Sequence, residues 1–335
     1  MENVHGESGA WKKLRSMCPD GIEKFEDIEN TRKTLTGDLD SKKGVFKENL
    51  PHLKIKEREK LKSHDIERDK KEKEWNKRIQ STRDSIKANK KLITNKHKIH
   101  YIFVLFGNYV KLVKNKYSKS SVLGKIDNEI TNQKGYIDEL EANPDSVFER
   151  ENNVIISKIN ELSKLKQENM NDYLGAEGEF IVLKELEKLG NKFHVFCDVD
   201  VHLDKPIPHR ATREHITRKQ LDFIVVGNTG IFVIEVKNWS SNTVKEQRYN
   251  ENPIEQVSKQ GLLLWKKLND SVSFEPYVKN ILVSIQGNIS PNPDYPRVKV
   301  KTPSSIRSYI EHTNKDLLDE EVDETVSILK RHLNN

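Results

Sequence analysis

Two carboxylates and one ammonium group lie inside strongly apolar segments between residues 221 and 237. These segments are rich in β-branched residues and flank a Gly-Asn-Thr-Gly sequence at 227–230, which predicts a β-hairpin. If Asn and Thr form a two-residue loop, Asp222 lies directly opposite Glu235. Directly paired residues have β-carbons about 4.5–5.5 Å apart, close enough for both carboxylates to hold one divalent cation. Lys237 lies two residues beyond Glu235 and therefore on the same face.

The alternation of residues predicts that both faces of this hairpin are covered. One face would carry Phe223, Val225, Phe232, Ile234 and Val236, and the other Ile224, Val226, Ile231 and Val233. A strand pair that is apolar on both faces is typical of an α/β sandwich. Two buried carboxylates without a counter-charge repel each other and are costly to desolvate, so a bound metal ion is favoured. In the alternative interpretation, both acids are solvated and Lys237 is an ordinary ion-pair partner.

Glu179 is a third candidate acid, on a helix predicted for residues 174–189. It shares a stripe with Leu183 and Leu186, which predicts that it faces the sheet. A carboxylate there needs a partner, which a metal ion beside the hairpin acids would provide. The alternative is that Glu179 simply lies near the helix N-terminus, where the helix dipole favours negative charge.

A second helix is predicted to begin at Pro253, because Asn252 is a favourable N-cap and proline suits the first helical position. Its predicted buried stripe consists of Ile254, Val257, Leu264, Trp265 and Leu268, with Gly261 allowing close approach to the sheet. Gln256 lies in the first turn, off this stripe. It either reaches the edge of the acidic site or is an exposed surface glutamine.

Basic residues precede and follow the hairpin. They are Arg210, Arg213, Arg218 and Lys219 on one side, and Lys245 and Arg248 on the other. We expect these loops to flank the acids and to contact nucleic-acid phosphates, which would make binding steeply salt-dependent. The alternative is that they only keep the loops soluble. Trp239 is positioned either to stack on a base or to cover the core.

The composition excludes a single ordinary core. The 335 residues suggest about two domains, and 34% are hydrophobic whereas 33% are charged. The net charge of +6 permits nucleic-acid contact without establishing it. Two widely separated cysteines, Cys18 and Cys197, indicate neither a zinc site nor a disulfide framework, so we expect a cytoplasmic protein. The N-terminus has no signal-peptide pattern.

Residues 54–170 show a sparse helical pattern. Ile79, Ile86 and Ile93 recur every seven residues, and Ile126, Ile130, Gln133, Ile137 and Leu140 alternate in steps of four and three. We predict an antiparallel coiled-coil hairpin or a dimerisation arm, with a homo-oligomer and protein partners as consequences. The predicted domains are 1–50, a cap that is partly disordered; 51–170, a helical arm; 171–290, an α/β domain; and 291–335, a helical extension.

The longest apolar run, residues 99–113, is interrupted by His100, Asn108 and Lys111. It is shorter than the roughly 18–20 apolar residues that span a bilayer, so no transmembrane segment is expected. We predict a buried core segment at the tip or base of the helical hairpin. Contact with a membrane surface, helped by the flanking lysines, is the alternative.

Four motifs occur in a specific order: GAEGE at 175–179, QLDFIVVG at 220–227, GIFVIEVKNW at 230–239 and NPIEQ at 252–256. Residues 173–288 thereby resemble the nuclease-related domain (NERD) family, a branch of the PD-(D/E)xK nuclease-like fold. The resemblance implies a restriction-endonuclease-like core, in which a central mixed sheet is flanked by helices. It covers about a third of the chain, and the long helical coiled-coil region before it carries no transferable function.

The resemblance also implies a nuclease that depends on a divalent cation. Glu179, Asp222 and Glu235 match the acidic metal positions, Lys237 the basic catalytic position, and Gln256 the glutamine on the following helix. Our hypothesis adds the carbonyl of Val236 as a ligand of Mg²⁺ or Mn²⁺. Many family members have a glycine-containing turn after the motif, whereas this chain has Ser-Ser-Asn at 240–242.

Two functions from different classes remain open at this stage. The first is metal-assisted hydrolysis of a nucleic acid, with DNA favoured over RNA, by an endonuclease acting as a bacterial anti-phage or DNA-repair effector. The second is a scaffold or sensor that binds nucleic acid without cleaving it and assembles through its coiled coil.

Overall fold

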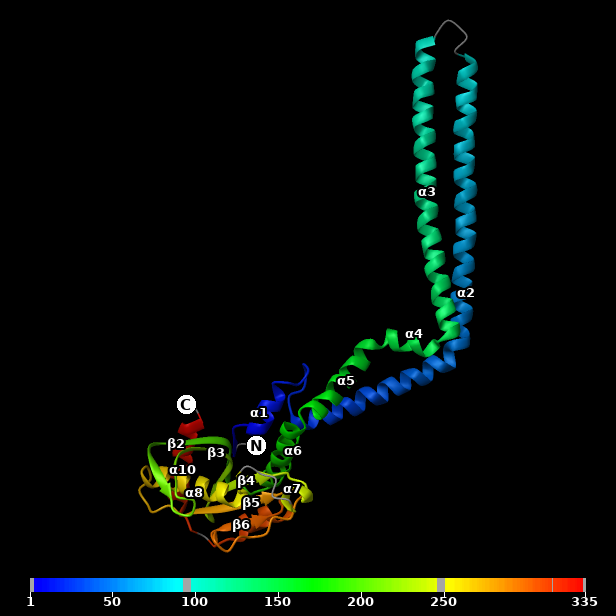
Figure 1. Ribbon diagram of the computed structural model, residues 1–335. Helices are drawn as coiled ribbons and strands as arrows, with labels where there is room; N and C mark the ends of the chain where they lie inside the picture. The colour runs from blue at the N-terminus through cyan, green and yellow to red at the C-terminus, as the bar shows by residue number, and fades with distance from the viewer. Residues whose placement is uncertain (1–2, 93–97, 246–250, 315, 334–335) are drawn as a thin grey trace. The chain divides into compact units, whose positions relative to one another are not determined.

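The computed structural model describes residues 3–92, 98–245, 251–314 and 316–333 (Figure 1). The chain divides into two compact units. The sheet unit comprises Met1–Lys33 and Lys158–Asn335, and the helical unit comprises Thr34–Ser157. Each unit is described by itself.

The sheet unit is built around a mixed sheet with the strand order β1-β2-β3-β4-β5-β6. The strands are β1 (Val4–His5), β2 (His194–His209), β3 (Glu214–Gly227), β4 (Gly230–Lys237), β5 (Val278–Ser284) and β6 (Val298–Lys301). The β2–β3 and β3–β4 pairs are antiparallel, whereas β1–β2, β4–β5 and β5–β6 are parallel. This mixed sheet with flanking helices confirms the predicted α/β class.

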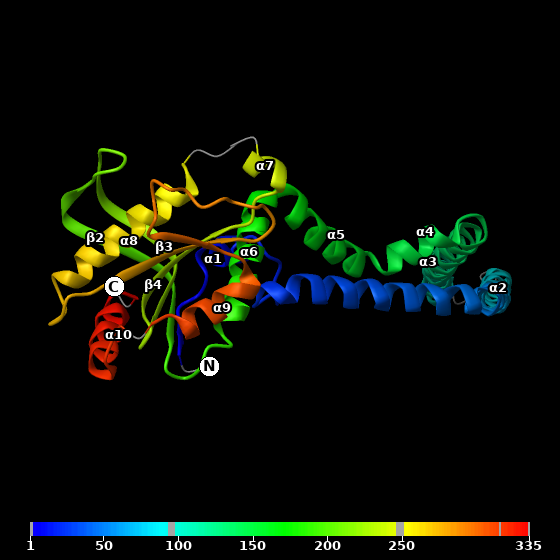
Figure 2. The same ribbon diagram turned by 90° about the horizontal axis from the view of Figure 1, so that it is seen from below.

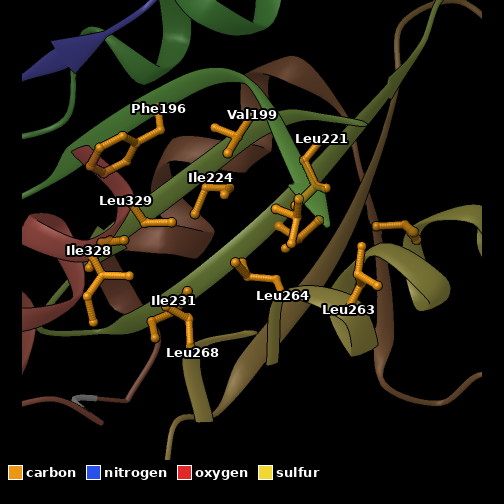
Figure 3. Packing of buried hydrophobic residues seen from close by; sticks show 14 of the residues in the cluster. Phe196, Val199, Leu221, Ile224, Ile231, Leu263, Leu264, Leu268, Ile328 and Leu329 are labelled. Atoms are coloured by element: carbon orange, nitrogen blue, oxygen red, sulfur yellow. The ribbon is translucent and has the colours of Figure 1, made fainter. Parts of the chain in front are cut away.

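Helices cover both faces of the sheet. They include α6 (Met170–Leu186), α8 (Pro253–Asn269), α9 (Pro303–His312) and α10 (Asp319–Leu333). Residues of α6 and α9 join the core on one face, and residues of α8 and α10 join the core on the other. Figure 2 shows these four helices around the strands. On the face that α8 covers, Leu264 and Leu268 of this helix lie against Ile224 and Ile231 of the strands (Figure 3).

The predicted hairpin register is confirmed. Gly227 pairs with Gly230, and Phe223 pairs with Ile234. Gly230 has φ +130°, a conformation that favours glycine in this tight turn. Phe223, Val225, Phe232, Ile234 and Val236 belong to the core under α6 and α9, whereas Ile224, Val226, Ile231 and Val233 belong to the core under α8 and α10. Both faces of the hairpin are therefore buried, as the alternation predicts.

Residues 3–33, for which the sequence predicted only a loose cap, are attached to the sheet unit. Strand β1 extends the sheet beside β2, and α1 (Gly9–Arg15) packs against α6. Trp11 and Leu14 are buried in a small cluster with Leu162 and Tyr173. The segment between β1 and α1 consequently lies beside α6.

The helical unit is dominated by α2 (Phe25–Leu92) and α3 (Lys98–Ala142) (Figure 1), which are followed by α4 (Pro144–Glu151). The first residues of α2 and most of α5 (Asn153–Glu168) belong to the sheet unit. The pairing of α2 and α3 is antiparallel, since Arg68 binds Asp127 at 2.6 Å and Lys119 binds Glu72 at 2.8 Å. The buried seam comprises Ile79, Ile86, Leu123, Ile126, Ile130, Ile137 and Leu140. The predicted antiparallel hairpin is confirmed, and its seam is covered within one chain. Ile93, which was assigned to the same repeat, lies outside the described residues.

The prediction that residues 99–113 form a buried segment is wrong for their described side chains. Ile102, Phe103, Phe106, Val110 and Val113 are all exposed. Apolar residues surround this part of α3, whereas a two-helix pair can cover only the side that faces α2. Among the described residues, no helix is long and apolar enough to cross a membrane.

Candidate active site

Asp222 and Glu235 lie opposite each other where the β3–β4 pairing ends. Asp222 precedes Phe223 and Glu235 follows Ile234, the last matched pair of the ladder. The Oδ2 atom of Asp222 accepts a hydrogen bond from the backbone N–H of Val236 at 2.8 Å. Alternation along the strands places both carboxylates on the face that α8 covers. Glu235 is only 2% exposed.

The two hairpin acids form a region of concentrated negative charge. Burial raises the pKa of Asp222 well above its ordinary range, and the nearby charges of Glu235 and Glu179 raise it further. The hydrogen bond from Val236 and the positive charge of Lys237 oppose this shift. A cation at this position would offset the repulsion between the carboxylates, which is the second cause of the raised pKa of Asp222 after burial.

Lys237 lies within this charge cluster. Its Nζ atom is 2.6 Å from Oε1 of Glu235 and 5.4 Å from the ring centre of Trp239. Burial alone would lower the pKa of Lys237, but the carboxylates of Glu235 and Asp222 hold it above its ordinary value. Lys237 is therefore a fixed cation near neutral pH, suited to stabilising negative charge rather than to removing a proton from water.

Gln260 of α8 holds the other oxygen of Glu235. Its Nε2 atom donates to Oε2 of Glu235 at 2.6 Å and to the backbone carbonyl of Gln220 at 2.9 Å. The side chain is 0% exposed, yet its Oε1 atom has no hydrogen-bond partner among the described residues. A buried amide oxygen without a partner is an available acceptor beside the acids.

The glutamine that reaches the acids is thus one turn further along α8 than the predicted Gln256. Gln256 is partly buried, and no side-chain hydrogen bond links it to the described residues. Gln260 lies three residues after Val257 and four before Leu264, both fully buried. A polar residue on an apolar stripe was the sequence feature that could have identified it.

Glu179 is also buried, but its nearest partners belong to the N-terminal segment. Its Oε2 atom accepts hydrogen bonds from Ser8 Oγ at 2.5 Å and from the backbone N–H of Ala10 at 3.3 Å. Burial raises the pKa of Glu179, these two donors oppose the shift, and the charges of Glu235 and Asp198 add to it. Burial is thus the main cause of the raised pKa of Glu179, and the charge of Glu235 is a smaller one.

The helix-dipole explanation for Glu179 is wrong, because α6 begins at Met170 and places this residue in mid-helix. Its contact with Ser8 was not foreseen. Ser8 is itself the N-cap of α1 and accepts from the backbone N–H of Trp11 at 3.2 Å. Nothing in the sequence pairs residues so distant along the chain.

The donor set fits a small, hard cation held by few protein ligands. Among the described residues, no three His, Cys, Asp or Glu side chains form a group that could hold a metal ion. Asp222 and Glu235 instead offer two carboxylates, and Gln260 offers an unpaired amide oxygen nearby. Mg²⁺ is commonly held by one or two carboxylates and completes its shell with water and substrate phosphates. These residues therefore fit an Mg²⁺ ion held by two carboxylates better than an ion held by three acids.

The predicted phosphate-binding residues differ in their availability. Arg218 binds Asp200 at 2.6 Å, and Lys219 lies 3.3 Å from Glu251. Arg210 and Arg213 are exposed in the turn between β2 and β3. The side chain of Lys245 and the whole of Arg248 lie outside the described residues.

The loop that departs from the family pattern forms a short helix. After Trp239, which is partly buried, α7 spans Ser241–Lys245. Ser240 Oγ accepts from the backbone N–H of Thr243 at 3.2 Å, which satisfies a donor of the first turn. The Ser-Ser-Asn sequence therefore replaces a glycine turn with a capped helical turn.

Residues 174–285 match the family model of the nuclease-related domain, NERD. The match begins within α6, ends just beyond β5 and contains Glu179, Asp222, Glu235 and Lys237. Comparison with the curated proteins and with the solved structures gave no match. The matched residues lie in the sheet unit, and the coiled coil of α2 and α3 lies outside the match.

Proposed function

We propose that the protein is a nuclease that hydrolyses phosphodiester bonds of DNA with a divalent cation. One observation carries the proposal: within the nuclease-related domain, the buried Glu235 is opposite Asp222 and is held between Lys237 and Gln260. Two acids and a fixed cation at the end of a strand pair match the requirements of metal-assisted phosphoryl chemistry.

Asp222 and Glu235 would hold Mg²⁺ or Mn²⁺, and Glu179 and the carbonyl of Val236 are further candidate ligands. The bound ion would polarise a phosphoryl oxygen and lower the pKa of a coordinated water. Glu179 would have to exchange its hydrogen bonds with Ser8 and Ala10 to join the shell.

Each neighbouring side chain has a definable task. Lys237 would place its positive charge beside the negative charge that develops on the phosphate in the transition state. Gln260 orients Glu235 through its Nε2 atom, and its free Oε1 atom would accept a hydrogen bond from a water. Glu235 thus keeps one orientation without depending on a bound ligand.

Contacts with the substrate would come from the exposed arginines at the β2–β3 turn, Arg210 and Arg213, and from Trp239. Arg218, Lys219, Lys245 and Arg248 remain candidates, and the first two would have to leave their carboxylate partners. We extend the proposal to a role in anti-phage defence or DNA repair, in a cytoplasmic homo-oligomer assembled through the coiled coil. The proposed role in defence or repair rests on the type of domain, and the proposed homo-oligomer rests on the helical arm.

The test is incubation of the purified full chain with supercoiled plasmid, linear duplex, single-stranded DNA and RNA, in Mg²⁺, Mn²⁺ or EDTA. We expect nicked or shortened DNA with either metal ion and none with EDTA, and we expect Asp222→Asn to remove the activity. Cleavage that persists at the wild-type rate in Asp222→Asn would place the active site elsewhere.

A second candidate function is a nucleic-acid-binding scaffold without catalysis. It is favoured by the lack of a three-ligand group among the described residues. In that case the chain would retard DNA in a gel, with a steep dependence on salt, while every substrate stayed intact in both metal ions.

A further inference from the structure

The exposed side chains at the start of α3 form a continuous apolar stripe. Its members are Phe103, Phe106, Val110, Val113 and Tyr117, which are 72%, 70%, 51%, 67% and 77% exposed. Their spacing of three and four residues places them along one side of the helix. The fourteen residue steps from 103 to 117 correspond to about 21 Å of helix. These five residues are called the stripe, and they contrast with the Lys- and Glu-rich surface of the described part of the helical unit.

The chain segment that contains the stripe carries acidic residues nowhere in its sequence, although one of its lysines, Lys119, pairs with Glu72 of α2. Residues 85–126 contain ten lysines and neither aspartate nor glutamate. Lys114 and Lys116 are exposed and flank the stripe on its two sides, and the Nζ atom of Lys90 lies 5.8 Å from the ring centre of Tyr109. Elsewhere on the same two helices, basic and acidic side chains alternate and pair, as Arg68 and Asp127 do.

We propose that this stripe binds the surface of a membrane that contains anionic lipids. An exposed apolar face bordered by lysines matches a lipid interface, where apolar side chains enter the boundary of the acyl chains and cations remain with the headgroups. Contact at the surface is consistent with the described helices, none of which is able to cross a bilayer. The lysines supply attraction to negative lipids, and the phenylalanines supply the buried area.

Two other occupants fit the stripe less well. A second copy would bring Lys114 and Lys116 against the same lysines of the first, and the next positions in the repeat are Ser120 and Gly124. The apolar repeat therefore spans about two heptads, fewer than the three or four typical of a coiled coil. A nucleic acid would use the lysines and the aromatic rings, but Val110 and Val113 offer it nothing.

The test is flotation of the full chain with vesicles of phosphatidylcholine alone or with about a third of phosphatidylserine. We expect binding to the anionic vesicles only, with an affinity that falls as salt rises. Replacing both phenylalanines (Phe103→Ser and Phe106→Ser) should weaken binding at least tenfold. Replacing both flanking lysines (Lys114→Gln and Lys116→Gln) should weaken it about twenty-five-fold, since each lysine near an anionic surface contributes roughly fivefold.

Matched controls use exposed apolar residues elsewhere on α2, namely Val45→Ser and Ile66→Ser, which are 57% and 69% exposed in the wild type. They should bind vesicles as the wild type does, and circular dichroism should show unchanged helix content in every variant. Equal binding by the wild type and the phenylalanine variant would overturn the proposal. So would a lack of binding to both vesicle types, a dimer that the phenylalanine variant abolishes, or DNA binding that requires Phe103. Nuclease activity in solution should be unchanged in all these variants, so the outcome is independent of the active site.

Discussion

The β3–β4 hairpin and the start of α3 are both strongly apolar and both carry charged residues, but their surroundings differ. The hairpin lies between two layers of helices, and its Asp222, Glu235 and Lys237 lie close to one another. The start of α3 contacts its partner helix on one side, and its lysines have no acids near them in sequence. The apolar content of a segment therefore does not determine its burial. Burial depends on how many neighbouring elements cover the segment.

The difference also separates two uses of charge. In the hairpin, burial forces the charged groups to interact, so each one changes the pKa of another. Along α3, the charged groups are exposed to water, and their summed charge sets the electrostatic potential of the surface. Variants of each region should accordingly fail in different assays.

The largest expected effect concerns Lys237. The variant Lys237→Met should lower the cleavage rate in Mg²⁺ by about a hundredfold to a thousandfold, because a fixed positive charge beside the reacting phosphate is lost. The control is Lys279→Met, since Lys279 is similarly buried but binds Asp316 outside the site. Equal losses in both variants would show that burial of a lysine, rather than its place in the site, explains the result.

A glycine-to-alanine substitution should change the free energy of unfolding in opposite directions at two positions. A β-carbon at Gly261 would overlap the buried Asn280 side chain, so Gly261→Ala should lower the free energy of unfolding by about 1–3 kcal/mol. At Gly124 in α3 nothing lies within 4 Å of an added β-carbon, so Gly124→Ala should raise it by about 0.5–1 kcal/mol. Urea unfolding of both variants measures the two effects, and a shared sign would contradict the assignment of crowded and open helix faces.

Gln260→Leu tests the amide that holds Glu235. It should lower the free energy of unfolding by about 1–3 kcal/mol, because the carbonyl of Gln220 and one oxygen of Glu235 lose their donor. Gln256→Leu, one turn away on the same helix, should stay within about 0.5 kcal/mol of the wild type. A larger loss of stability in Gln256→Leu than in Gln260→Leu would instead support Gln256, the glutamine predicted from the sequence.

The smallest effect is a dependence of stability on pH. The pKa of Asp222 is raised by folding, so the folded state binds more protons than the unfolded state between the ordinary value of 3.8 and the raised value. Stability from this group is present at low pH and is lost as pH rises through that window. Glu179 contributes with the same sign. The variant Asp222→Asn should therefore show a flatter fall in melting temperature from pH 4 upward, and an unchanged slope would contradict the raised pKa.

Local patterns predicted much of the sheet unit. The turn glycines set the hairpin register, and Asn252 with Pro253 set the start of α8, where the Asn252 side chain accepts from the Ile254 N–H at 2.9 Å. Contacts between distant segments were not predictable in this way. Ser8 donates a hydrogen bond to Glu179, which is 171 residues away in the sequence. Gln260, and not the expected Gln256, hydrogen-bonds Glu235, because the whole buried stripe of α8 sets the rotation of this helix. The exposure of Phe103 depends on how many helices surround α3, which its own sequence does not encode.

The central claim is that Asp222 and Glu235 together hold a divalent cation, and melting of the full chain in Mn²⁺ against EDTA tests it most directly. At an ion concentration about a hundred times the dissociation constant, binding stabilises the folded state by about 2.7 kcal/mol. We predict a rise in melting temperature of about 5 °C or more for the wild type and for the exposed-acid control Asp204→Asn. We predict no rise for Asp222→Asn. An equal rise in all three proteins, or no rise in the wild type, would contradict the account.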